Sequence, residues 1–162
     1  MTEAALVIGY GHGLRSDDGV GPRVAQLLAK EDGVGVLVRH QLVLELADDL
    51  RDRAVVVFVD AATTLEPGAV AARRVAAAEA AQTPGLTHHC SPDALLLLAE
   101  RLYGARPHAF LVTIGASSFA LGDELSPPVA AALPEAAALV RRLLAAPEDV
   151  SFAPYPAPRR QR

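Results

Sequence analysis

The chain has 162 residues, of which 51% are apolar and 21% are charged, and its formal net charge is −4. This length and apolar content predict one globular domain with a sizeable core and exclude a wholly disordered chain. The acidic balance and scattered arginines argue against nucleic-acid binding. The apolar runs are too short to span a membrane, and the N-terminus lacks a signal-peptide pattern. With Cys90 as its one cysteine, the chain is expected to be a soluble cytoplasmic protein without an intrachain disulfide.

The first elements surround a glycine-rich segment, GYGHGLRSDDGVG, at residues 9–21. An apolar run precedes it and apolar residues at helical spacing follow it, which predicts a strand, a turn and a helix ending near Gly33. Asp17 is interpreted as a helix cap, so that Asp17→Asn should cost about 1 kcal/mol or less. Asp18 is either a second acid at the helix start or a metal ligand.

Nucleotide binding is the weakest interpretation of this segment. The third glycine of a G-x-G-x-x-G pattern would come one residue early, and the two acids would occupy the position that a phosphate needs. A P-loop is excluded, because the chain has no G-K-S or G-K-T sequence in such a turn.

The middle of the chain alternates between strands and helices. Residues 34–39 predict a second strand, and 41–50 have helical spacing. Residues 54–59 form the most apolar segment, which is typical of a central strand covered on both faces, and this strand is expected to stop at Asp60. A weaker strand at 69–75 follows a short turn and ends in arginines, which indicates a hairpin at a sheet edge, with an antiparallel orientation as one option.

The second half predicts a helix over 92–102 that is capped by Ser91, then a buried strand over 109–115. The last helix should run from about residue 127 to 146, with Pro134 kinking or restarting it. Together the elements predict a single α/β domain over 1–146 with three α/β/α layers. Residues 147–162 are rich in proline and arginine and are expected to be extended or disordered.

Two acids and a histidine fall where sites form in such sheets, beyond the carboxyl ends of the strands. Asp18 follows the first strand, Asp60 ends the third, and His88 or His89 lies in a loop before a helix. Asp, Asp and His form a mixed oxygen and nitrogen set that suits a divalent transition metal. Each also has an ordinary structural interpretation, since an aspartate after a strand often caps a turn.

Four short motifs in this order resemble the hydrogenase maturation endopeptidases, over roughly residues 6–144. They are an Ile-Gly-x-Gly with Ser-Asp-Asp-Gly-Val-Gly at 8–21, Val-Phe-Val-Asp-Ala at 57–61 with Pro-Gly at 67–68, Thr-His at 87–88, and Gly-Asp-Glu-Leu-Ser-Pro at 122–127. The resemblance implies a phosphorylase/hydrolase-like fold with a mixed, mostly parallel five-stranded sheet and one antiparallel strand.

The resemblance also implies the activity and the site. The family removes the C-terminal extension from the nickel-loaded large-subunit precursor of nickel–iron hydrogenases. Its metal-contacting residues would correspond to Asp18, Asp60 and His88, which are the candidate catalytic and metal residues; His88 ranks above His89 because it directly follows Thr87. Asp17 would keep its capping role. Nickel would come from the substrate, other divalent ions would bind the same residues in vitro, and a monomer is expected.

The chain departs from the family's pattern at two places that should line the site. His12 stands where the family usually has asparagine, and His40-Gln41-Leu42 replaces a glycine-rich loop. Two further interpretations stay open at this point. One is a cysteine protease that uses Cys90, for which a small buried thiol is the alternative role. The other is a non-catalytic, nickel-dependent binding or chaperone protein for a metalloenzyme subunit.

Overall fold

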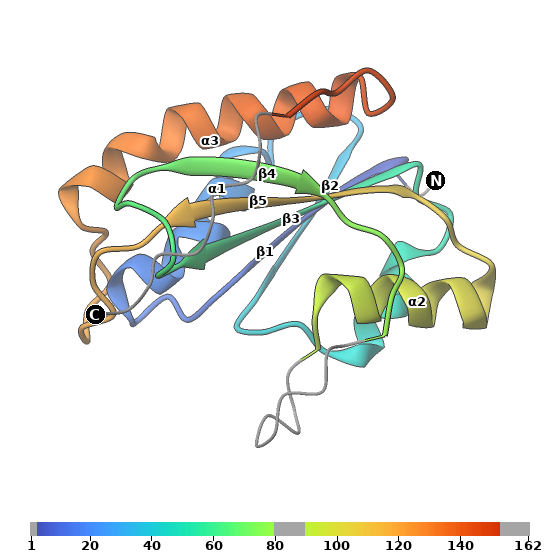
Figure 1. Ribbon diagram of the computed structural model, residues 1–162, viewed down its shortest axis with the longest axis horizontal. Coiled ribbons are helices and arrows are strands. Elements are labelled where there is room, and N and C mark those ends of the chain that lie inside the picture. The colour runs from blue at the N-terminus through green and yellow to red at the C-terminus, as the bar shows by residue number, and fades with distance from the viewer. Residues whose placement is uncertain (1–2, 80–89, 153–162) are drawn as a thin grey trace.

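A computed structural model describes residues 3–79 and 90–152, and these form a five-stranded mixed sheet. The strand order is β2-β1-β3-β5-β4, with bounds β1 Ala5–Tyr10, β2 Val34–Arg39, β3 Val55–Ala62, β4 Val70–Arg74 and β5 His108–Gly115. Neighbouring strands are parallel except β4, which is antiparallel to β5; in Figure 1 the arrowheads of β4 and β5 point in opposite directions.

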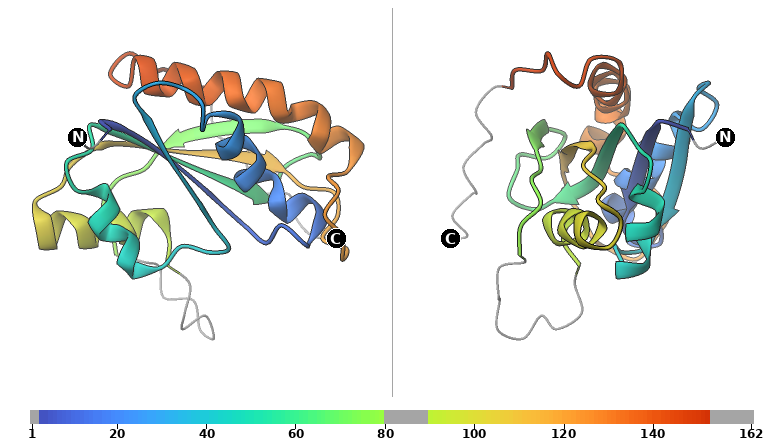
Figure 2. Two further views of the ribbon diagram at one scale, coloured as in Figure 1. Left: turned by 180° about the vertical axis from the view of Figure 1, so that it is seen from behind. Right: turned by 90° about the vertical axis from the view of Figure 1, so that its right-hand side faces the viewer.

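Helices cover both faces of this sheet, as the views of Figures 1 and 2 show. The helical elements are the 3₁₀ turns η1 Ser16–Gly19 and η2 Leu44–Leu50 and the α-helices α1 Val20–Leu27, α2 Pro92–Tyr103 and α3 Pro127–Ala145. α1 and α3 lie on one face, and α2 and η2 lie on the other. The predicted α/β/α sandwich with one antiparallel strand is therefore confirmed.

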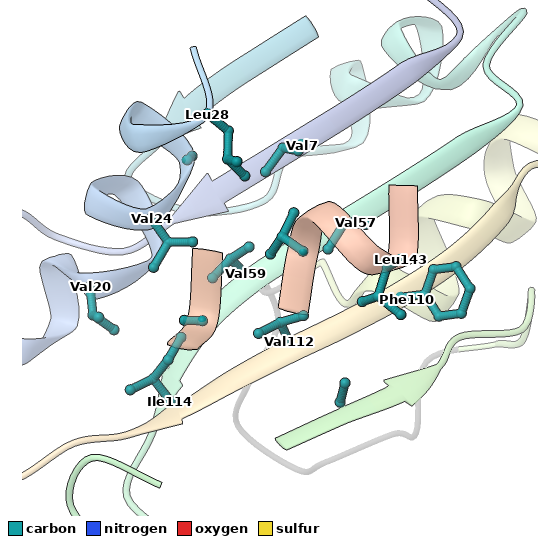
Figure 3. Packing of buried hydrophobic residues seen from close by; sticks show 14 of the residues in the cluster. Val7, Val20, Val24, Leu28, Val57, Val59, Phe110, Val112, Ile114 and Leu143 are labelled. Carbon is teal, nitrogen blue, oxygen red and sulfur yellow. The ribbon is translucent and has the colours of Figure 1, made fainter. Parts of the chain in front are cut away.

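Two hydrophobic clusters fill the spaces between the layers. Strand alternation sends Val57 toward α1 and α3, whereas Phe58 points toward α2. Figure 3 shows Val24 of α1 and Leu143 of α3 packed over Val57 and its neighbours. The β3 residues from Val55 to Val59 are at most 4% exposed, which confirms the predicted central strand. Each such side chain contributes about 1.5–3 kcal/mol on burial.

The start and end of α2 agree with their sequence signals. The Ser91 Oγ accepts a hydrogen bond from the Ala94 backbone N–H at 3.2 Å, and Pro92 takes the first helical position. Gly104 ends the helix with φ +66°, a left-handed conformation that glycine adopts without steric strain.

Several element predictions need correction. The strand expected at 69–75 is β4, but it does not form a hairpin with β3. It pairs with β5, which comes later in the chain, so the pairing of β4 is set by tertiary packing. The helix expected over 41–50 is the short turn η2, and α1 ends at Leu27 and is followed by i+3 turns. α3 is one helix across Pro134, because packing of its buried face outweighs one missing backbone bond.

Residues 147–152 follow α3 without regular secondary structure. The Phe152 ring packs edge-to-face against Phe110 with 5.9 Å between ring centroids, and the Arg74 guanidinium donates to the Pro147 carbonyl at 2.9 Å. The predicted tail beyond residue 152 lies outside the described residues. Within the described part of the chain, no helix combines the length and apolarity that a membrane crossing requires.

Candidate active site

Asp18 lies in η1, the turn that joins β1 to α1. Its Oδ2 accepts a hydrogen bond from the His12 backbone N–H at 2.7 Å. Gly11 passes beside it with φ +143°, and a Cβ added to Gly11 would lie 1.9 Å from the Asp18 carbonyl oxygen. Only glycine fits this approach, so the glycine-rich turn fixes the backbone that carries Asp18.

Asp60 lies within β3 and not at its end. The strand continues through two further pairs with β5, Ala61 with Ile114 and Ala62 with Gly115, so the expected stop at Asp60 was wrong. Alternation places Asp60 on the same face of the sheet as Phe58, toward α2. Its Oδ1 accepts a hydrogen bond from the Ala61 backbone N–H at 2.8 Å.

Asp18 and Asp60 line one pocket of about 510 Å³ at the carboxyl ends of β1 and β3. The segment His40-Gln41-Leu42, which departs from the family's glycine-rich loop, was expected to line the site. It does line this pocket. His12, which was also expected to line the site, does not line the pocket; its backbone N–H binds Asp18, and its ring packs on His40 with 5.0 Å between centroids. Two acids that are 42 positions apart in sequence (60 minus 18) are thus brought together.

The third predicted site residue cannot be placed. His88 and its alternative His89 lie outside the described residues, whereas Cys90 lines the pocket. Within residues 3–79 and 90–152, no three His, Cys, Asp or Glu side chains are grouped to hold a metal ion. Of the predicted trio, the described part of the site therefore supplies the two carboxylates, while the third carboxylate of the pocket, Asp93, is paired with Arg73.

The environment of Asp60 favours its neutral form. Burial, together with the nearby charge of Asp18, raises the pKa of Asp60 from 3.8 to about 7, although hydrogen bonds from Ala61 and Tyr10 act in the opposite direction. Burial and the Asp60 charge also raise the pKa of Tyr10, so this phenol stays protonated. Asp60 can therefore exchange a proton near neutral pH inside the pocket.

This pKa predicts a pH-dependent stability. Between about pH 4 and pH 7 the folded protein binds a proton at Asp60 that the unfolded chain has released, so the free energy of unfolding falls as pH rises. The expected loss is up to about 4 kcal/mol across this window. Urea unfolding of the wild type and of Asp60→Asn at about pH 5 and about pH 8 measures it. The variant should lose less stability than the wild type, and equal losses would contradict the assignment.

Asp17 is not a cap of α1. It is fully buried, and its carboxylate accepts backbone N–H bonds from Ser117, Ser118 and Ser126 and a hydroxyl bond from Ser126, at 2.7–2.8 Å. Burial alone would raise the pKa of Asp17, but the bonds from Ser126, Ser117 and Ser118 together lower it. Each buried donor left unsatisfied costs about 1–3 kcal/mol, so the helix-cap estimate for Asp17→Asn is too small.

Sequence reasoning missed several pocket residues, among them Tyr10 and Arg73. Tyr10 continues the alternation of Leu6 and Ile8 onto the α2 face, so the period of β1 was a usable signal. Arg73 is placed by the pairing of β4 with β5, which the sequence does not reveal. Its guanidinium lies 3.6 Å from the Asp93 carboxylate of α2, and this ion pair spans the pocket wall.

The fold and the pocket that holds Asp18 and Asp60 together define an α/β protein with a site at the carboxyl edge of a mixed sheet. No protein-family model and no curated protein sequence matches the chain. Solved structures do match it. The hydrogenase maturating endopeptidase HybD from E. coli is 24% identical with a TM-score of 0.69, and the match covers 89% of this chain and 93% of HybD.

Two archaeal structures match the chain with similar sequence identities and TM-scores. A hydrogenase 2 maturation peptidase from a Thaumarchaeota archaeon is 28% identical with a TM-score of 0.64, over 87% of this chain and 97% of its own. The nickel–iron hydrogenase maturation protease HybD from Thermococcus kodakarensis is 23% identical with a TM-score of 0.64, over 86% and 98%. The two HybD structures show that the fold is shared. The 28% identical maturation peptidase agrees with the resemblance that the four motifs indicate.

Proposed function

We propose that this protein is an endopeptidase that removes the C-terminal extension from a nickel-loaded large-subunit precursor of a nickel–iron hydrogenase. The observation that carries the proposal is the meeting of Asp18 and Asp60 in one pocket. Asp18 reaches it from η1 and Asp60 from β3, in a fold shared with solved proteins that are named as hydrogenase maturation proteases.

In this proposal Asp18, Asp60 and His88 contact the nickel that the substrate carries. Two carboxylates in one pocket repel each other, and a divalent cation relieves that repulsion. Carboxylate oxygens and an imidazole nitrogen form a donor set that suits such a cation. In the sequence, His88 precedes the pocket residue Cys90 by two positions.

The two acids take different roles. Asp60 has a pKa of about 7 in the free protein and is ionised once nickel lies beside it, so the carboxylate oxygen that does not contact the metal can accept a proton from the attacking water as a general base. Asp18 is held by the His12 N–H and helps to orient the cleavage point beside Asp60. Nickel in the substrate would supply polarisation of the scissile carbonyl or of the water.

Cys90 has the position but not the chemistry of a nucleophile. It lines the pocket, and its Sγ–H donates to the Ser91 carbonyl at 3.5 Å. Burial raises the pKa of the Cys90 thiol, which disfavours the thiolate that a cysteine protease needs.

We therefore expect Cys90→Ser to keep most of the cleavage activity, within about threefold of the wild type, since nucleophile loss would cost far more. The measurement is the rate of precursor processing, with thiol alkylation of the wild type as a second arm. Complete loss of cleavage in a folded Cys90→Ser protein would restore the cysteine-protease interpretation.

Mass spectrometry of a nickel-loaded precursor incubated with the protein tests the proposed function. Loss of a C-terminal peptide from the precursor is the expected result. A stable complex in which the precursor stays intact would instead support the non-catalytic, nickel-dependent binding protein.

A further inference from the structure

We propose that Asp17 is a positioning residue that fixes Asp18 in the pocket by locking η1 to the loop 116–126. The expected effect of Asp17 on cleavage rests on the proposed function. The placement of Asp18 by Asp17 does not, because it concerns only contacts among described residues. Nothing in the four motifs or in the pocket itself assigns this role, since Asp17 does not line the pocket.

The first observation is the set of bonds around the Asp17 carboxylate. Oδ2 accepts the backbone N–H groups of Ser117 and Ser118 at 2.8 Å each and the Ser126 hydroxyl at 2.8 Å. Oδ1 accepts the Ser126 backbone N–H at 2.7 Å. One buried carboxylate thus binds both ends of a loop that begins about 100 positions later in the chain.

The second observation is the backbone of Ser16, directly before Asp17. Ser16 has φ +50°, a left-handed conformation that costs a non-glycine residue free energy and persists only where surrounding contacts impose it. The same loop supplies those contacts: the Ser16 N–H donates to the Gly122 carbonyl at 2.8 Å, and its hydroxyl donates to the Glu124 carbonyl at 2.7 Å. The Gly122 N–H returns a bond to the Leu14 carbonyl at 2.9 Å.

These two observations have one geometric result. The left-handed turn at Ser16 is followed by a buried Asp17, whose side chain is bound by the loop, and by Asp18, whose side chain lines the pocket. The bond between Asp18 Oδ2 and the His12 N–H depends on where this backbone lies. Without the Asp17 carboxylate, only backbone bonds and the Ser16 hydroxyl hold the loop to η1, so Ser16 relaxes and Asp18 shifts from its position.

The test compares Asp17→Asn with Leu143→Ala. An amide cannot accept all the bonds that the Asp17 carboxylate accepts, because its NH₂ group faces N–H donors. Leu143 is a fully buried residue of α3, does not line the pocket, and its truncation also destabilises the protein. Ser126→Ala, which removes only the hydroxyl bond, is the milder variant if Asp17→Asn does not fold.

The first readout is the exchange rate of the His12 amide, measured by NMR where each variant is folded. We expect about a tenfold rise in Asp17→Asn, as in Asp18→Asn, and little change in Leu143→Ala. The second is kcat/KM for precursor cleavage, with an expected loss of about a hundredfold in Asp17→Asn, because misplacement of an orienting group is costly.

The outcomes separate the two claims. An unchanged His12 exchange rate in Asp17→Asn, or an equal rise in Leu143→Ala, overturns the positioning role whatever the enzyme does. If the wild type does not cleave the precursor, the proposed function fails, and the amide exchange still decides whether Asp17 positions Asp18.

Discussion

Asp60→Asn is expected to lower the rate of precursor cleavage by about 10²–10⁴-fold, the range typical of losing a general base. Asparagine keeps the shape of the side chain and can accept the Ala61 N–H, so the fold should survive. It cannot take up a proton near neutral pH, and it is a weaker cation ligand than a carboxylate. The measurement is single-turnover cleavage of a nickel-loaded precursor at saturating enzyme.

The pH dependence of precursor cleavage is a second test of the role of Asp60. In the free protein Asp60 has a pKa of about 7 and acts as a base only when it is ionised, so kcat/KM for wild-type cleavage should rise with pH through about 7 and then level off. Asp32→Asn is the matched control, because Asp32 is an exposed acid between α1 and β2 and does not line the pocket. Near-normal cleavage by Asp60→Asn, or a flat wild-type profile, would remove Asp60 from the chemistry.

Gly11→Ala is the second change with a large expected effect. The new Cβ would lie 1.9 Å from the Asp18 carbonyl oxygen, and φ +143° is closed to alanine, so η1 has to move. A displacement of Asp18 by about 1 Å would slow cleavage about a hundredfold. Circular dichroism and the urea midpoint report the fold, and processing of the precursor reports the site.

Gly33→Ala separates the cost of a positive φ from the effect of the close contact with Asp18. Gly33 also has a positive φ, +76°, but no heavy atom lies within 4 Å of an added Cβ. It should therefore lose only about 1–2 kcal/mol of backbone stability and keep wild-type cleavage. If Gly11→Ala behaves like Gly33→Ala, the close contact does not position Asp18.

The predicted Asp60 effects also link stability with activity. The same burial and the same Asp18 charge that raise the pKa of Asp60 destabilise the fold once Asp60 ionises. Asp60→Asn should thus be inactive and yet less sensitive to rising pH than the wild type. Such a trade-off is expected where a carboxylate is kept buried for its chemistry.

Local patterns were enough to predict most of the architecture. The uninterrupted apolar run at 55–59 identified the central strand, and Ser91 with Pro92 identified the start of α2. What local patterns could not give was pairing between distant segments. β4 reads as a hairpin partner of β3, and only the sheet shows that it pairs with β5, which begins more than 30 residues later.

The site residues likewise divide into those that local patterns predict and those that depend on distant contacts. Asp18 could be predicted because it follows β1, and Asp60 because it lies near the carboxyl end of the recognisable strand β3, and these ends meet at one edge of a parallel sheet. Asp17 was misjudged because aspartate before a helix is ordinarily a cap, and its true partners lie about 100 positions away. The choice of His88 over His89 rests on the resemblance alone and stays a prediction.

The most direct test of the proposed function compares nickel-loaded and nickel-free forms of the same large-subunit precursor, using wild type and Asp18→Asn with mass spectrometry as the readout. The wild type should remove a C-terminal peptide from the nickel-loaded form only, and Asp18→Asn should leave both forms intact. Equal cleavage of the nickel-free form, or undiminished cleavage by Asp18→Asn, would contradict recognition of substrate nickel by this pocket.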